Sequence, residues 1–314
     1  MENHRHTKPI RKEDKEMEFA PIIVFAFNRP EALTDTVSSL LANDEAAESP
    51  LFVFVDGPRE NKSGEREKVE EVRRYVKSVR GFKSVEFCFS EENKGLGCSI
   101  IAGVSDVINR YGRAIVLEDD LVLSRNFLSF MNQGLDLYAD KKEVFSVCGY
   151  SNKIKVPSGY HYDAYFCTRS SSWGWATWAD RWNTVDWELK DWERYAKMAK
   201  AFNRWGGSDC FRMLRSVKEG WGNSWAIRFG FSQFLQDKLS LFPIVSKVDN
   251  DGFDGDGTNC KKWSRFKHVM DTGNSKDFCF PNDVRLNPKI FKSAMSYNSI
   301  PIRIWSRIMY VIHR

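Results

Sequence analysis

Short, unbroken runs of apolar residues, each followed at once by polar or turn-forming residues, constrain the fold of this chain most strongly. The clearest runs are residues 22–27, 51–55 and 114–117. A continuous apolar run of this length is typical of a β-strand that is buried on both faces, as in a parallel sheet. Two further strands are predicted at Ser84–Phe89 and Val144–Cys148.

Segments with helical periodicity separate these strands. Apolar residues recur at three- and four-residue spacing, which predicts helices over residues 31–41, 65–79, 95–111 and 126–138. Strands that alternate with helices favour an α/β fold with a mainly parallel sheet and right-handed crossovers. We expect this sheet to occupy residues 19–148.

The pattern changes after residue 148. Nine of the eleven tryptophans lie between Trp173 and Trp225, without a repeated strand–helix pattern. We expect residues 149–298 to form a second, tryptophan-rich lobe, with a late strand at residues 240–248 and a glycine-rich loop at residues 250–257.

The two ends of the chain differ from its body. Residues 1–18 are polar and lack an apolar stretch, which predicts a disordered tail. Residues 299–314 alternate apolar residues with arginines, which predicts a basic amphipathic helix. Such a helix either lies on an anionic membrane surface or packs its apolar side on the core.

Charge and cysteine content indicate the broad class of protein. The net charge of +5 is spread along the chain and does not indicate nucleic-acid binding. The seven cysteines are odd in number and include no C-x-x-C pair, which favours reduced thiols over a disulfide framework or a zinc site. No signal peptide or membrane-spanning run is visible, so we expect a protein that is either cytoplasmic or peripheral at the inner face of the membrane.

An acidic cluster follows the strand at residues 114–117. Glu118, Asp119 and Asp120 come directly after this strand, and polar residues also follow the first two strands. In open α/β sheets, ligands bind at the carboxyl ends of the strands. Carboxylate oxygens suit Mg²⁺ or Mn²⁺, and a nucleotide diphosphate supplies further oxygen ligands. The alternative is a solvated acidic turn that caps the following helix.

Four motifs together resemble those of a known family. IIVFAFNRP at residues 22–30, VDGP at 55–58, NKGLG at 93–97 and IVLEDDL at 115–121 occur in family-like order and spacing. They resemble the GT-A-fold nucleotide-sugar glycosyltransferases, in particular N-acetylglucosaminyltransferase I and the bacterial sugar transferases of polysaccharide clusters. The resemblance continues more loosely through residues 172–178, 224–228 and 251–255.

The resemblance implies a fold and an activity. The fold would be GT-A-like (Rossmann-like), with residues 19–148 as the nucleotide-sugar-binding half and residues 149–298 as the acceptor-side half of the same domain. The activity would be metal-dependent, inverting transfer of a hexosyl or N-acetylhexosaminyl group from a UDP-sugar. The acceptor would be a saccharide or a lipid-linked saccharide in surface polysaccharide synthesis.

The resemblance also implies residue roles. Asp120 would bind the Mn²⁺ or Mg²⁺ ion. The residues expected at the nucleotide-sugar donor are Arg29, Asp56, Lys94, Glu118 and Asp119. Each of these residues also has an alternative role that involves no ligand. Residues 56–58 would then form only a turn, Arg29 would be a surface residue beside Pro30, and residues 93–97 would be a loop that leads into a helix.

Inverting transfer requires a base that deprotonates the acceptor hydroxyl. The carboxylates considered for this role are Asp180, Asp237, Asp251 and Asp254. Residues 222–226, where the resemblance places the base, contain no acid. We favour Asp180; the alternative is that it only pairs with Arg181 or caps a helix. Trp173 and Trp175 flank a glycine and are candidates to stack on a sugar, against the alternative of core packing.

Two other functions compete with this hypothesis. A sugar-phosphate nucleotidyltransferase shares the nucleotide half, but it requires a glycine-rich phosphate loop after the first strand. Asn28, Arg29 and Pro30 stand there instead. A non-catalytic carbohydrate-binding protein on the same fold is the third hypothesis, because the base is unassigned.

Overall fold

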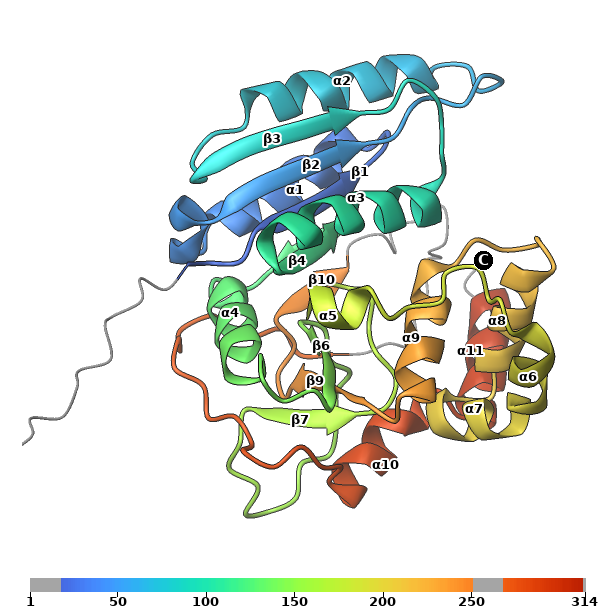
Figure 1. Cartoon of the computed structure of the whole chain (residues 1–314). Coiled ribbons are helices and arrows are strands. Elements are labelled where there is room, and N and C mark those ends of the chain that lie inside the picture. Colours follow the sequence, from blue (N-terminus) through green and yellow to red (C-terminus); the bar gives the residue numbers. More distant parts are fainter. Residues whose placement is uncertain (1–17, 251–267, 313–314) are drawn as a thin grey trace, which may run out of the picture.

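A single eight-stranded sheet forms the centre of the molecule (Figure 1). The computed structural model describes residues 18–250 and 268–312. The strand order is β3-β2-β1-β4-β8-β6-β9-β7, and β10-β5 form a separate two-stranded sheet. The strands are β1 Ile22–Ala26, β2 Pro50–Val55, β3 Ser84–Phe89, β4 Arg113–Glu118, β5 Leu121–Leu123, β6 Val144–Cys148, β7 Ala164–Cys167, β8 Trp175–Trp178, β9 Leu239–Pro243 and β10 Val248–Asn250.

Six of the eight strands in the large sheet run in the same direction. β1 pairs in parallel with β2 and β4, and β2 pairs in parallel with β3. β8 is antiparallel to both β4 and β6, and β9 is parallel to β6 but antiparallel to β7. The predicted α/β fold with a mainly parallel sheet is confirmed. The carboxyl ends of β1, β2, β3, β4, β6 and β9 therefore lie along one edge of the sheet.

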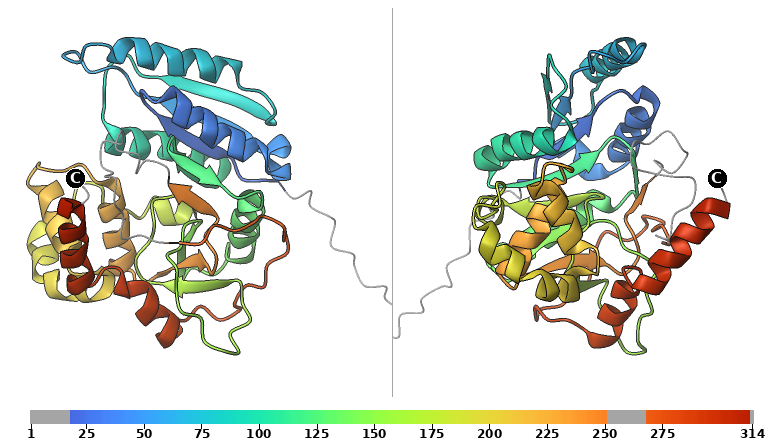
Figure 2. Two further views of the ribbon diagram at one scale, coloured as in Figure 1. Left: turned by 180° about the vertical axis from the view of Figure 1, so that it is seen from behind. Right: turned by 90° about the vertical axis from the view of Figure 1, so that its right-hand side faces the viewer.

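Helices cover both faces of this sheet, as Figures 1 and 2 show. One face packs against α1, α2 and α4, and the opposite face packs against α3, α5 and α9. Alternate residues of β1 supply both cores, because Ile22 and Val24 point to the first face and Ile23 and Phe25 to the second. The helices concerned are α1 Pro30–Leu41, α2 Glu65–Ser78, α3 Leu96–Tyr111, α4 Phe127–Leu137, α5 Ala179–Trp182 and α9 Trp225–Leu235.

The tryptophan-rich half differs from the sequence prediction in its strands. It contributes β7, β8 and β9 to the same sheet, although its sequence shows no repeated strand–helix pattern. The single strand expected at residues 240–248 is two strands, β9 and β10, which belong to different sheets. The chain leaves β9 after Pro243, and β10 then pairs antiparallel with β5. One apolar stretch of the sequence therefore supplies strands to two different sheets.

The remaining helices lie around the second half and the C-terminus. Three short helices pack against α9 in a cluster that includes Phe202, Leu214 and, from α9, Phe231. They are α6 Trp192–Lys197, α7 Ala199–Gly206 and α8 Cys210–Lys218, and they precede α10 Pro288–Ser296 and α11 Ile300–Ile312. A 3-10 helix, Asp44–Glu48, links α1 to β2. In the part of the chain that the structure describes, no helix has the length and apolar character needed to cross a membrane.

The cysteines and the first residues complete this description. Cys88, Cys98, Cys148, Cys167, Cys210 and Cys279 are free thiols, and Cys260 lies outside the described residues. The tail predicted over residues 1–18 lies outside them as well, apart from Glu18.

Candidate active site

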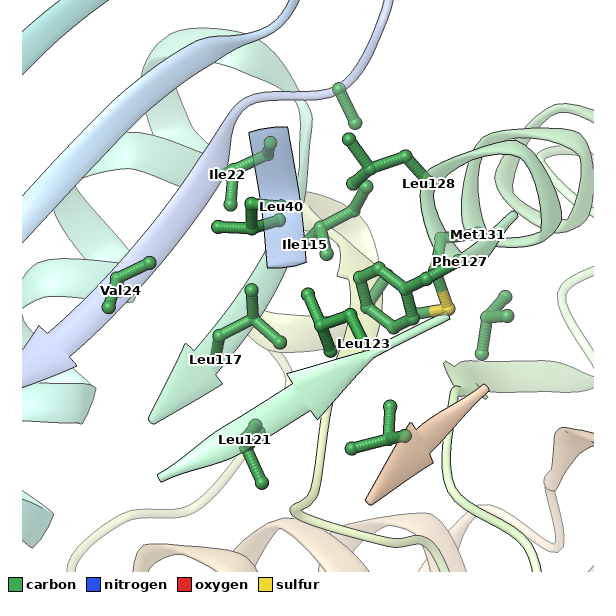
Figure 3. Close-up of a cluster of buried hydrophobic side chains, with 14 of the residues drawn as sticks. Ile22, Val24, Leu40, Ile115, Leu117, Leu121, Leu123, Phe127, Leu128 and Met131 are labelled. Carbon is green, nitrogen blue, oxygen red and sulfur yellow. The ribbon is translucent and has the colours of Figure 1, made fainter. Parts of the chain in front are cut away.

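The acidic turn, residues 118–120, is anchored on both sides in the hydrophobic core. Glu118 is the last residue of β4, and Asp119 and Asp120 form the turn into β5. Leu117 and Leu121, which flank the turn, are both 0% exposed and pack with side chains of β1, α1 and α4 (Figure 3). This packing holds the three carboxylates at a rigid position on the carboxyl-end edge of the sheet.

The turn after β1 meets the acidic turn. The Arg29 guanidinium donates from Nη2 to Oδ1 of Asp119 at 2.5 Å and to Oδ2 of Asp120 at 3.2 Å. The Phe27 amide donates to Oδ2 of Asp119 at 3.3 Å. Asp119 is only 4% exposed, so these contacts satisfy a buried carboxylate. Two of the motifs read from the sequence, after β1 and after β4, are thus brought into contact.

Negative charge in the acidic turn exceeds what Arg29 neutralises. Burial, together with repulsion by Asp120 and Asp119, raises the pKa of Glu118 to about 8, although Arg29 opposes this shift. Burial also raises the pKa of Asp119 to about 6, although Arg29 opposes this shift. Both shifts show that the ionised forms are costly here without another cation.

A divalent cation fits this environment. The available donors are hard carboxylate oxygens, which Mg²⁺ and Mn²⁺ prefer. Within residues 18–250 and 268–312, no three His, Cys, Asp or Glu side chains converge as a ready-made metal cage.

Asp56 ties two loops together at the end of β2. Its Oδ1 accepts hydrogen bonds from the amides of Gly57 at 3.0 Å and Lys94 at 2.9 Å, and its Oδ2 accepts from Gly95 at 2.9 Å. Asn93 donates from Nδ2 to the Gly57 carbonyl at 2.8 Å. In this structure Asp56 therefore shapes the loop that carries Lys94, a role that the sequence alone does not reveal.

The two halves of the chain meet closely beside this loop. Gly95 has a φ of 76°, which suits glycine, and α3 begins at the next residue. A Cβ on Gly97 would lie 2.2 Å from the backbone oxygen of Asn223. Asn223 also accepts from Arg228 Nη2 at 3.1 Å. The acid-free segment 222–226 thus lies against the loop at residues 93–97.

The structure does not bring Asp180 to the acidic turn. β8 is antiparallel to β4, and Trp178 is paired with Arg113 at the start of β4, whereas Glu118 is at its end. Asp180 follows Trp178 and pairs with Lys142 and Arg181, each at 2.6 Å. The base candidate favoured from the sequence therefore lies toward the opposite edge of the sheet from the acidic turn.

The other carboxylate candidates are no better placed. Asp237 precedes β9, which runs parallel to β4, so it also lies toward the amino-end edge. Asp251 and Asp254 lie outside the described residues.

A different carboxylate does approach the acidic turn. Asp249 of β10 is paired with Val122 and lies 3.1 Å from His268 Nε2. The sequence gives no sign of this pair, because its members are 19 residues apart in the chain.

The tryptophans flanking Gly174 have different environments. Trp175 is 1% exposed and stacks on Trp225 at 4.7 Å and on Trp182 at 5.7 Å, so its ring is part of the core. Trp173 is only partly buried and packs edge-on against Tyr150 at 4.5 Å. Gly174 has a φ of 62°, and this left-handed backbone separates the two neighbours.

Comparison with solved structures finds distant similarity to several sugar transferases. The mannosyltransferase PcManGT from Pyrobaculum calidifontis, in complex with GDP-Man and Mn²⁺, is 12% identical with a TM-score of 0.37, over 53% of this chain and 49% of that chain. S. aureus TarS 1-349 is 11% identical with a TM-score of 0.41, over 74% and 61%. The galactosyltransferase LgtC, with donor and acceptor sugar analogs, is 13% identical with a TM-score of 0.34, over 56% and 65%.

These similarities cover about half of the mannosyltransferase and under two thirds of the other two chains. No curated protein sequence matches this chain.

The sequence also matches a family directly. The GNT-I family matches residues 4–201, a segment that contains the four motifs at the strand ends. Because this match covers more than half of the 314 residues, the chain belongs to the GNT-I family of glycosyltransferases.

Proposed function

We propose that this protein transfers a sugar from a UDP-sugar to a saccharide or lipid-linked saccharide acceptor, with inversion, in the synthesis of a surface polysaccharide. The observation that carries the proposal is the acidic turn, held by Arg29 at the carboxyl ends of β1 and β4. In sheets of this kind, that edge is where nucleotides bind. Membership of the GNT-I family supports sugar transfer as the chemistry.

Asp120 would hold the divalent cation. A bound Mn²⁺ or Mg²⁺ would neutralise the negative charge that develops on the leaving diphosphate. Arg29 orients the carboxylates of Asp119 and Asp120 through its two hydrogen bonds. Glu118 and Asp119 would contact the ribose or the sugar of the donor.

The loop at residues 93–97 would border the nucleotide. Asp56 holds this loop through the amides of Lys94 and Gly95. The Lys94 ammonium would then attract the donor phosphates. The Asp56 carboxylate would accept a further hydrogen bond from the base or the ribose, while the three backbone amides that donate to it keep it fixed.

A second candidate is a carbohydrate-binding protein that has lost catalysis. The segment at residues 222–226 presents an amide, Asn223, rather than a carboxylate to the loop at residues 93–97. This candidate requires sugar binding without nucleotide binding, so the two candidates are separable by one titration.

The deciding experiment is calorimetric titration with UDP, GDP and their sugars, with and without Mn²⁺. We expect Mn²⁺-dependent binding of UDP or of one UDP-sugar, and loss of the Mn²⁺ dependence in Asp120→Asn. A folded protein that binds no nucleotide under any of these conditions would refute the transferase proposal and favour the second candidate.

We further propose that α11 rests on an anionic membrane surface, where a lipid-linked acceptor would be found. Four large apolar side chains of this helix are exposed by 47–58%: Ile300, Ile304, Trp305 and Ile308. Residues 299–314 include three arginines and no acid, so their charge complements anionic lipid. Figure 2 shows α11 on the outside of the molecule.

Vesicle sedimentation tests this surface. We expect the protein to sediment with phosphatidylglycerol vesicles but not with phosphatidylcholine vesicles, and Ile304→Glu with Trp305→Glu to abolish the effect. Equal sedimentation of the wild type and the double variant would refute the proposal. Concentration-dependent dimerisation lost in the same variant would instead assign the helix face to a second copy of the chain.

A further inference from the structure

A pocket of about 240 Å³ lies on the tryptophan-rich half, apart from the acidic turn. Its floor is the apolar cluster that β7 and β9 form with α10, which includes Tyr165, Phe242 and Ala294. The segment leading from β7 to β8, residues 168–174, runs along one side, and α10 with Asn298 closes the other. The pocket is smaller than the roughly 300–1,000 Å³ of pockets for drug-sized ligands, so its size suits a single sugar ring.

Packing contacts connect the pocket to the acidic turn. Trp173 lines the pocket, and a Cβ on the adjacent Gly174 would lie 3.4 Å from the side chain of Leu117, the residue before Glu118. On the other side, Tyr150 lines the pocket and packs against His268 with ring centres 5.5 Å apart.

His268 in turn contacts Asp249, which is paired with Val122 two residues after Asp120. The wall formed by Tyr150 and Trp173 is therefore linked to both ends of the acidic turn through these neighbouring residues.

The lining combines aromatic and hydroxyl groups. Trp173 and Tyr150 form an edge-to-face pair with ring centres 4.5 Å apart. Three consecutive serines, Ser170, Ser171 and Ser172, and the amides of Asn152 and Asn298 also line the pocket. Aromatic faces pack against the C–H surfaces of a pyranose, while hydroxyl and amide groups bond to its hydroxyls.

Among the described residues that line the pocket, the one cationic side chain, Arg169, is already paired with a carboxylate. Arg169 Nη1 lies 3.0 Å from Asp209 Oδ1 and donates to the Gly206 carbonyl at 3.1 Å. The pKa of Asp209 is lowered by Arg169 despite its burial, so this carboxylate is ionised and balances the guanidinium. This balance favours a neutral ligand over a phosphate or a uronic acid.

We propose that this pocket binds one neutral pyranose ring of the acceptor, with Trp173 on the side facing the acidic turn. The proposal rests on the proposed function, because it assigns the acceptor side of the same reaction. It restricts the acceptor class to saccharides with an uncharged ring near the reacting hydroxyl. It also makes Trp173, and not Trp175, the tryptophan of the pair that contacts sugar.

The test is saturation-transfer NMR with the methyl glycosides of glucose, galactose, mannose and N-acetylglucosamine, together with methyl glucuronide. We expect at least one neutral glycoside to bind and the glucuronide to bind at least tenfold more weakly. Ala294→Phe places a ring in the pocket, and Trp173→Leu removes the aromatic wall. Each should weaken glycoside binding by about tenfold.

The controls separate local from general effects. Lys292→Phe adds the same ring to an exposed position of α10 and should leave binding unchanged. If Ala294→Phe does not fold, Trp173→Leu and Asn298→Leu decide. Wild-type protein that binds no glycoside, or variants that bind as well as wild type, would overturn the proposal.

Calorimetry with UDP and Mn²⁺ on the same variants distinguishes this failure from failure of the donor site. We expect the pocket variants to keep wild-type nucleotide affinity. Nucleotide binding with unaffected glycoside binding would refute only the pocket. Glycoside binding that depends on the pocket, without any nucleotide binding, would refute only the proposed donor site.

Discussion

The sheet edge at the acidic turn and the tryptophan-rich region between Trp173 and Trp225 organise their side chains in opposite ways. At the sheet edge, short strands end in polar residues, and the order of the strands brings Arg29, Asp56 and the acidic turn to one side. In the tryptophan-rich region, residues of the same type occupy different environments. Trp175 is 1% exposed and Trp221 is 83% exposed.

This difference shows which sequence patterns predict where a side chain lies in the fold. A polar residue after a buried strand has a defined place, because the strand fixes where the chain leaves the sheet. The presence of a tryptophan in the sequence carries no such constraint, and the role of its ring depends on what packs around it. The following predictions test this contrast, in order of expected effect.

Replacing Trp175 should have the largest effect, on stability. Trp175→Ala removes a ring that stacks between Trp225 and Trp182, and we expect a loss of about 3–5 kcal/mol in the free energy of unfolding. Trp221→Ala, at an exposed ring, should change it by less than about 0.5 kcal/mol. Urea unfolding measures both. Similar losses in the two variants would contradict the assignment of Trp175 to the core.

Replacing Asp120 should have the next largest effect, on activity. Asp120→Asn removes the carboxylate expected to hold the cation, and we expect transfer to fall by about 10²–10³-fold. Asp180→Asn is the matched control and should keep activity within about twofold, because Asp180 and its partners, exposed Lys142 and buried Arg181, lie toward the opposite edge of the sheet from the acidic turn. Initial rates at saturating Mn²⁺ measure both. A larger loss of transfer activity in Asp180→Asn than in Asp120→Asn would support Asp180 as a site residue.

The contact between the two halves should be sensitive to one methyl group. Gly97→Ala places a Cβ against the Asn223 backbone, which cannot move without shifting residues 222–226. We expect a loss of about 1–3 kcal/mol in stability and weaker nucleotide binding. Gly230→Ala, in α9, meets only Ser170 Oγ at 3.9 Å and should gain about 0.5–1 kcal/mol. Thermal unfolding tests the opposite signs, and a neutral Gly97→Ala would mean that the halves are not tightly packed here.

The loop held by Asp56 should show the smallest effect. In Asp56→Asn the amide nitrogen faces the Gly95 amide, so one of the three backbone hydrogen bonds is lost. We expect a loss of about 1 kcal/mol in stability. We also expect a several-fold weaker affinity for UDP, measured by calorimetry. Unchanged UDP affinity in a destabilised variant would limit Asp56 to holding the loop.

Much of the sheet was predictable from the sequence, and the outcome at each element has a physical reason. Residues 22–26, 51–55 and 114–117 lie in strands, as expected, because short continuous apolar runs are typical of strands buried on both faces of a sheet. β7 and β8 were missed because their four residues each carry too little periodicity. β9 and β10 were merged because an apolar stretch does not indicate where the chain changes partner.

The site was predictable to the same extent. The acidic turn and Arg29 lie at strand ends, and the sequence alone determined that they share one edge of the sheet. The environment of Asp180, the burial of Trp175 and the pairing of Asp249 with His268 were decided only by the tertiary structure. These three depend on the direction of β8, on the packing of α9 and on a contact between residues that are distant in the sequence. Strand ends are local consequences of chain order, whereas burial and pairing arise from segments that meet only when the chain is folded.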